Sequence, residues 1–279
     1  MRLPFTHESR VRSHARRSRA LGVTLLEMIM VIVITGIIGA AIALFIRAPV
    51  GSYVDATRRA ELTDIADTAL RRITRDLRTA LPNSVRVDGT GKYIEYLQTS
   101  GGGRYRAEVD SGGGGNALDF TVADTQFDAI GTMPSFAAGD QIVVYNLGAG
   151  SGSTDAYAGG NRTAFSSVAA PTVTIAAKQF PFASPGKRFQ VVQYPVTYAC
   201  EAGVLRRYWG YPISAAQPVP PVGGNSALLA TNVDAAACSF SYTTAGASQR
   251  TGVVSVTLQI SQSGESVRLF QQVHVNNFP

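Results

Sequence analysis

The pattern of apolar residues changes character three times along the chain. Residues 1–22 are polar and rich in arginine, whereas residues 23–46 form an apolar run in which Glu27 is the only charge. From Val54 to Leu77, apolar residues recur at three- to four-residue spacing, or twice that, between charged ones. This spacing predicts an amphipathic helix with a charged outer face. From residue 84 onward, short apolar or alternating runs predict strands.

The apolar run is long enough to cross a membrane. Its 24 residues would extend about 36 Å as a helix, against about 30 Å of bilayer hydrocarbon. A cleaved secretory signal fits poorly. The apolar region of such a signal is shorter than this run and ends in a small-residue cleavage site. A plain signal anchor fits the hydropathy but leaves Glu27 unexplained, since a carboxylate at mid-bilayer costs roughly 2.5–3.5 kcal/mol.

The positions of prolines predict where the long helix is interrupted. Pro49 lacks an N–H donor and is expected to kink or locally break it, and the segment 81–83, with Pro82 at its centre, is expected to end it. The predicted fold class is therefore α+β, with a long N-terminal helix packed on an antiparallel sheet. The predicted parts are a cytoplasmic N-terminal segment 1–22, a transmembrane helix 23–46, its amphipathic continuation 47–81 and a β-rich domain 82–279.

Within the β-rich domain, turn residues separate the predicted strands. Glycine-rich loops are expected at 101–103, 112–115 and 148–160, and a Pro/Gly loop at 217–224. The last two strands are expected to form a hairpin around Ser263 and Gly264. The predicted strands are 93–97, 118–122, 141–145, 172–175, 189–194, 204–208, 239–242, 253–260 and 266–275.

The net charge of +6 is concentrated at the N-terminus. Residues 1–22 contain six arginines and one glutamate, a net of +5, so the remaining residues carry only +1. This excess before the apolar run places the N-terminus in the cytoplasm and the bulk of the chain across the membrane. Without residues 1–22, no strong positive field remains, so nucleic acid is not expected as a partner.

The two cysteines, Cys200 and Cys238, both lie far downstream of the apolar run. Two cysteines do not make a metal site in a chain of this size, but in an oxidising compartment they would form one disulfide. The alternative is a pair of unbonded, buried thiols.

The sequence lacks the constellations that catalysis or metal binding requires. Of three histidines, two lie in residues 1–22 and only His274 remains, which indicates a structural role. No Gly-Lys-Ser/Thr follows the glycines at 148–152, so this loop does not bind phosphate as a P-loop does. No catalytic residue, metal or cofactor is therefore expected, and the protein is not expected to be an enzyme.

Neither a calcium site nor a sugar site is expected at two further groups of residues. Four acidic residues lack the alternating spacing of a calcium loop, and three clustered aromatic residues are expected to pack in the core and loops rather than to bind sugar. The acidic residues are Asp124, Asp128, Asp140 and Asp155, and the aromatic ones are Tyr208, Trp209 and Tyr211.

Gly22 ends the arginine-rich segment, Glu27 stands five residues beyond it, and the apolar run follows. This arrangement, in which residues 22–27 read GVTLLE, resembles the class III signal of type IV prepilins and type II secretion pseudopilins. The resemblance implies that a membrane prepilin peptidase cuts after Gly22 and N-methylates Val23. Glu27 would then stand where the family carries its glutamate, at the fifth position of the mature chain. The chain departs from the family in its long leader and in Val23, where many members have Phe or Met.

The residue types are consistent with this resemblance. Gly22 has no side chain to obstruct a peptidase, and the basic residues before it hold the leader in the cytoplasm. A carboxylate in an apolar helix requires a cation, which the N-terminal amine of a neighbouring subunit can supply in a filament. The family also has glycine and proline where this helix loosens on assembly, and Gly36 and Pro49 are the candidates here.

Short segments near the C-terminus narrow the resemblance. They resemble O-type minor pilins of mannose-sensitive haemagglutinin (MSHA) pilus systems and are also similar to J-type pseudopilins of type II secretion. The segments are 198–200, 203–207, 238–240 and 272–279.

The resemblance implies a pilin fold and a minor subunit that takes part in starting or assembling a pilus or pseudopilus filament. The implied partners are the prepilin peptidase/methyltransferase, other major and minor pilins, the inner-membrane assembly platform and the inner membrane itself. The implied location is the inner membrane, with a cytoplasmic N-terminus and a periplasmic C-terminal domain, followed by the filament. The alternative is a membrane-anchored periplasmic binding or adhesive domain that does not polymerise.

Overall fold

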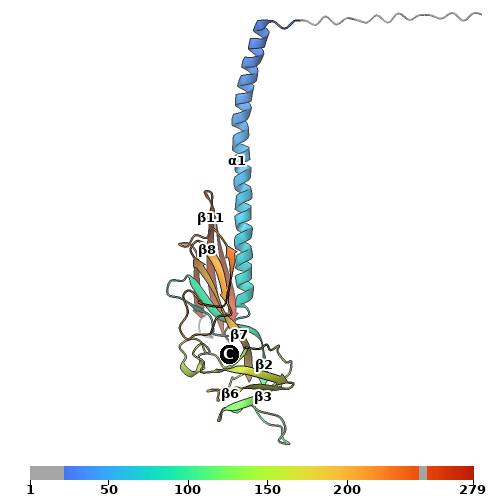
Figure 1. Cartoon of the computed structure of the whole chain (residues 1–279), viewed down its shortest axis with the longest axis vertical. Coiled ribbons are helices and arrows are strands. Elements are labelled where there is room, and N and C mark those ends of the chain that lie inside the picture. The colour runs from blue at the N-terminus through green and yellow to red at the C-terminus, as the bar shows by residue number, and fades with distance from the viewer. Residues whose placement is uncertain (1–21, 245–249) are drawn as a thin grey trace, which may run out of the picture. The chain divides into compact units, whose positions relative to one another are not determined.

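The computed structural model describes residues 22–244 and 250–279 (Figure 1). It contains one long helix followed by antiparallel strands, which confirms the predicted α+β class. The chain divides into two compact units, Met1–Val54 and Asp55–Pro279, which are described separately. The elements are α1 (Leu25–Leu77), β1 (Arg86–Val87), β2 (Tyr93–Tyr105), β3 (Asp124–Ile130), β4 (Gln141–Val144), a 3-10 turn (Gly152–Thr154), β5 (Arg162–Ala169), β6 (Thr172–Lys178), β7 (Arg188–Glu201), β8 (Val204–Trp209), β9 (Asn225–Ala230), β10 (Ser239–Thr244), β11 (Thr251–Gln262) and β12 (Glu265–Asn276).

The described part of the first unit consists almost entirely of α1. The predicted apolar run is helical from Leu25 onward, and the helix continues through Pro49 without interruption. Of the predicted kink or local break at Pro49, the break is therefore wrong, and the kink stays a prediction. Proline removes a single backbone donor, and a helix can accommodate that loss while the hydrogen bonds of its neighbouring turns are kept.

The helix ends at Leu77, four residues before the predicted end at Leu81. The backbone of Leu81 instead donates to the carbonyl of Leu97, at 2.8 Å, and Thr99 donates to the carbonyl of Thr79, at 2.9 Å. Residues after the helix thus satisfy their backbone groups by pairing with β2. Tertiary pairing, rather than Pro82, decides where the helix stops.

One face of α1 forms the centre of the main core in the second unit. Its buried residues follow the three- to four-residue spacing of the predicted amphipathic helix. They pack with residues of β2, β7 and β8 and with the separate three-stranded sheet β10-β11-β12. The buried helix residues are Leu62, Ala66, Ala69, Leu70, Ile73 and Leu77.

The other nine strands form one antiparallel sheet in the order β1-β2-β3-β6-β5-β4-β7-β8-β9, with an additional pairing of β2 and β7. This pairing closes six strands, β2-β3-β6-β5-β4-β7, into a barrel. The barrel encloses a second core, which includes Phe127, Ile142, Val173 and Phe189. Strands β2 and β7 therefore belong to two layers, because one end of each lies in the barrel and the other lies in the sheet that covers α1.

The change from one layer to the other coincides with irregular pairing of β2 with β7 between Gln98 and Gly101. Residues 101–103, predicted as a loop, lie within β2. A Cβ atom on Gly102 would lie 2.7 Å from the carbonyl oxygen of Phe189, and one on Gly103 would lie 2.8 Å from the Phe189 ring. The glycines are thus explained by a close approach of β7 rather than by a turn.

The structure corrects several other strand predictions. Residues 118–122 form a loop rather than a strand, in which the Asp119 backbone N–H donates to the Asp124 carboxylate and the Thr121 backbone N–H donates to that of Asp119. Strands β1, β3, β5 and β9 were not predicted, and the predicted strand 189–194 is part of the longer β7. The hairpin at Ser263 and Gly264 is confirmed, with φ angles of 51° and 85° that fit a two-residue type I′ turn.

The packing of α1 yields a stability prediction. Ile73 is fully buried, so Ile73→Ala is expected to destabilise the second unit by about 2–5 kcal/mol through lost apolar contacts and a cavity. The measurement is thermal unfolding of the full chain in detergent, followed by the fluorescence of Trp209, the single tryptophan. Arg71→Ala is the control, because the Arg71 side chain is 80% exposed on the same helix. Equal unfolding temperatures of the two variants would contradict this account of the core.

Candidate assembly segment

The first unit exposes apolar side chains on every side of α1. Residues 23–46 include sixteen large apolar residues that are exposed, from Val23 to Ile46. Within the described part of the chain, α1 is the one helix that is long and apolar enough to cross a membrane. An apolar surface of this extent requires a cover, which lipid or other helices can provide.

The helix begins with a local cap that the sequence analysis did not recognise. Thr24 lies just before the first helical residue, and its hydroxyl accepts a hydrogen bond from the Glu27 backbone N–H at 3.3 Å. Residues 24–27 read TLLE and match the Ser/Thr-x-x-Glu/Gln capping box, which could have been found by its spacing. Glu27 also lies in the first turn, where a negative charge interacts favourably with the helix dipole.

Gly22 and Val23 lie outside the helix and are exposed. The peptide bond between them, the predicted cleavage position, is therefore in a non-helical segment just before the N-cap. The rest of the predicted leader, residues 1–21, lies outside the described residues. Val23 would be the first residue of a cleaved chain, one position before the capping threonine.

Gly36 has no packing role that the described residues explain. A Cβ atom placed on Gly36 or on Gly39 would have no heavy atom within 4 Å beyond the local helix backbone. Neither glycine lies next to a helix break, since α1 is continuous. The predicted loosening at Gly36 and Pro49 during assembly stays a prediction.

In the second unit, a buried ionic cluster joins α1 to the sheet. The Asp76 carboxylate accepts hydrogen bonds from Arg207 at 2.9 Å and from the Tyr198 hydroxyl at 2.7 Å. Burial, followed by the nearby charge of Asp76, raises the pKa of Tyr198 well above its ordinary value, so its hydroxyl remains a donor. A second ion pair, between Arg59 and Glu265 at 2.7 Å, joins α1 to the start of β12.

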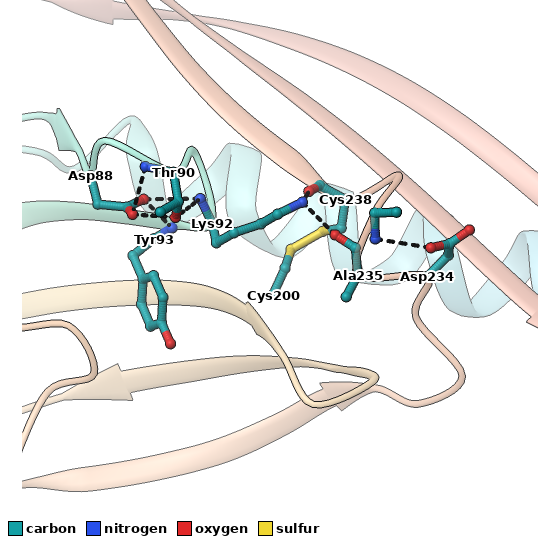
Figure 2. Close-up of a disulfide and its surroundings, with 9 residues drawn as sticks. Asp88, Thr90, Lys92, Tyr93, Cys200, Asp234, Ala235 and Cys238 are labelled. Atoms are coloured by element: carbon teal, nitrogen blue, oxygen red, sulfur yellow. Dashed lines mark hydrogen bonds between the residues drawn. A yellow bond between two sulfur atoms is a disulfide. The ribbon is translucent and has the colours of Figure 1, made fainter.

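Cys200 and Cys238 are joined by a disulfide, as predicted, with their Cα atoms 6.2 Å apart (Figure 2). Cys200 lies in β7 and Cys238 lies directly before β10. The bond thus links the nine-stranded sheet to the three-stranded sheet, and both cysteines are buried in the core that surrounds α1. No free cysteine occurs within residues 22–244 and 250–279.

Lys92 reinforces this link, as Figure 2 shows. Its ammonium group donates to the carbonyl oxygens of Ala235 and Cys238. The turn before Lys92 is held by Asp88, whose carboxylate accepts the backbone N–H groups of Thr90, Lys92 and Tyr93 at 2.8–2.9 Å. Partial burial raises the pKa of Asp88, but hydrogen bonds from the Thr90 hydroxyl and from these backbone N–H groups outweigh it and hold the pKa below its ordinary value.

The other candidate residues take part in local structure. The four aspartates considered for calcium each accept at least one backbone N–H, as Asp128 does from Asn116 at 2.9 Å and Asp140 from Ala137 at 2.8 Å. No group of three or more metal-binding side chains occurs among the described residues. His274 is exposed on β12.

The predicted packing of the aromatic cluster is confirmed. Tyr211 is buried and donates to Glu95 at 3.1 Å, while Trp209 packs on the main core beneath the Arg207 guanidinium. Tyr208 is partly buried and donates to Glu201.

Comparison of the chain with protein-family models, with curated protein sequences and with solved structures gave no match. The assignment of function therefore depends on the residues and their geometry.

The disulfide yields a second prediction. It closes a loop with a sequence separation of 38, which in the chain-entropy model stabilises the fold by roughly 3–4 kcal/mol. Replacing both cysteines with alanine should lower the free energy of unfolding by about this amount. Treating the parent protein with a reductant should have the same effect and leave the double variant unchanged. Non-reducing mass spectrometry of protein from the cell envelope should find the bond, and two free thiols there would contradict the prediction.

Proposed function

We propose that this chain is a minor type IV pilin-like subunit, processed by a prepilin peptidase, that takes part in starting or assembling a pilus or pseudopilus filament. The observation that carries the proposal is the segment GVTLLE, which lies at the start of a helix whose large apolar residues are all exposed up to Ile46. Its location would be the inner membrane first, with the second unit in the periplasm, and then the filament.

The exposed helix suits two environments in succession. Before assembly, lipid would cover residues 23–46, whose length matches a bilayer. After assembly, the equivalent helices of other major and minor pilins would replace the lipid. The open space around Gly36 and Gly39 supports this idea, because small residues let helix backbones approach closely.

Glu27 supports assembly rather than simple anchoring. Near the end of the helix its carboxylate can stay close to lipid headgroups, but among packed helices it would need a cation. Residues 23–46 contain no lysine or arginine. The amine released at Val23 is the remaining nearby cation, and a neighbouring subunit can present its own amine to Glu27.

The disulfide supports the proposed periplasmic location of the second unit, because such bonds persist in oxidising compartments. The alternative function is a membrane-anchored binding domain that does not polymerise. The barrel favours that alternative, because it extends β2 and β7 beyond the layer that covers α1.

Processing is the first test of the proposal. Intact-mass measurement of the protein extracted from membranes should find a chain that begins at Val23 and carries one N-methyl group. Gly22→Val should retain the leader, because a branched side chain beside the scissile bond would obstruct the peptidase. The substitution should not disturb the fold, since nothing lies within 4 Å of a Cβ on Gly22. A parent chain that still begins at Met1, in cells with an active prepilin peptidase, would refute the proposal.

The second test separates the charge of Glu27 from its role in the helix cap. Glu27→Gln retains a capping-box residue and removes only the charge, so membrane insertion and cleavage should persist. Loss of one partner from a buried ion pair typically costs 3–5 kcal/mol, so incorporation into filaments and co-purification with partner pilins should fall by at least about tenfold.

Glu61→Gln is the matched control, because Glu61 is exposed on the same helix. This control should assemble as the parent does. If Glu27→Gln also assembles as the parent does, the assembly role is wrong and the anchored-domain alternative is favoured.

A further inference from the structure

One surface of the barrel, where β2 pairs with β7, combines features of an anion-binding site. Arg104 on β2 and Arg188 on β7 are directly opposite each other in the antiparallel ladder. Opposite residues of such a ladder project from the same face of the sheet, and like charges in this arrangement destabilise it. The pair therefore lowers the stability of the barrel unless a negative group lies between the two side chains.

The chain itself provides no such group within residues 22–244 and 250–279. Neither Arg104 nor Arg188 forms an ion pair there. Arg106, two residues along the chain, differs in this respect, because it pairs with Asp110 at 2.5 Å and with Asp128 at 3.5 Å. The neighbouring cation on this stretch of chain thus has acidic partners that the two opposed arginines lack among the described residues.

Both arginines line one hollow of about 340 Å³. Its other lining residues are glycines 102, 103 and 131, together with Thr132 and the half-exposed Ile130. None of the lining residues is acidic. The volume lies at the lower end of the range for small-molecule sites, and it suits a group the size of a sugar phosphate.

We propose that this hollow binds a phosphate group, either free or carried by a small organic molecule, between Arg104 and Arg188. Guanidinium groups match the geometry of phosphate oxygens and bind them through paired N–H donors. A phosphate dianion neutralises both arginines at once, whereas a single carboxylate neutralises one. The Thr132 hydroxyl is a further donor on the rim, and Ile130 offers an apolar contact for a carrier. This proposal does not depend on whether the protein polymerises.

The test compares the unfolding temperature of the detergent-solubilised full chain with those of three variants. Arg104→Gln removes one charge and nothing else that the structure assigns to Arg104. Arg188→Gln also removes a cation–π contact, since the guanidinium lies 5.7 Å from the Phe278 ring centre. Lys187→Gln is the control, because it removes the same charge one residue from Arg188 but outside the hollow.

Without ligand, Arg104→Gln should unfold about 1–3 °C higher than the parent, because the repulsion is gone. This gain should shrink in high salt, which screens the repulsion. If Arg104 instead stabilised the fold, Arg104→Gln would lower the unfolding temperature. A lower unfolding temperature for Arg104→Gln than for the parent would therefore overturn the proposal.

Millimolar inorganic phosphate or glucose 6-phosphate should raise the unfolding temperature of the parent and of Lys187→Gln, but not that of Arg104→Gln or Arg188→Gln. Equal shifts with the two probes would show that the phosphate group alone is recognised, and a shift with the sugar phosphate alone would show that the carrier is recognised too. Either result supports the site. Equal shifts in the parent and Arg104→Gln, an equal shift with acetate, or no shift with either probe would overturn it.

Discussion

Burial of one face of α1 between Leu62 and Leu77 is the interaction on which the second unit depends. The strands of two separate sheets contribute to the same core, in which the helix face packs among their apolar side chains. The disulfide between Cys200 and Cys238 is placed in this core and joins the two sheets covalently. A helix of this kind owes most of its stability to packing rather than to intrinsic propensity.

A polar cluster within that interface gives the packing its orientation. Asp76 accepts from both Arg207 and Tyr198, so the helix has a preferred rotation and height against β7 and β8. Buried ion pairs contribute little net stability compared with well-packed apolar residues, but removal of one partner is costly. The cluster is therefore better understood as a constraint on how α1 meets the sheet than as a major source of stability.

The barrel is built on the same two strands that cover the helix. The irregular pairing of β2 with β7 between Gln98 and Gly101 marks the change of layer, and the glycines that follow allow β7 to approach closely. The unit thus has two cores with different roles. One holds α1, and the other fills the barrel, whose surface carries the hollow lined by Arg104 and Arg188.

The sequence by itself determined the elements whose pattern is local. The apolar run, the amphipathic spacing to Leu77, the hairpin at Ser263 and the presence of two cysteines in the β-rich part are properties of neighbouring residues, and the structure contains them. Thr24 could also have been recognised as the helix cap, because its spacing to Glu27 is local.

The closure of the barrel, the end of α1 and the strand at residues 101–103 depended on the tertiary structure. Each arises from pairing between residues far apart in the chain, such as Leu81 with Leu97 or Gly102 with Gln190, and such pairing overrides the local preferences of proline and glycine.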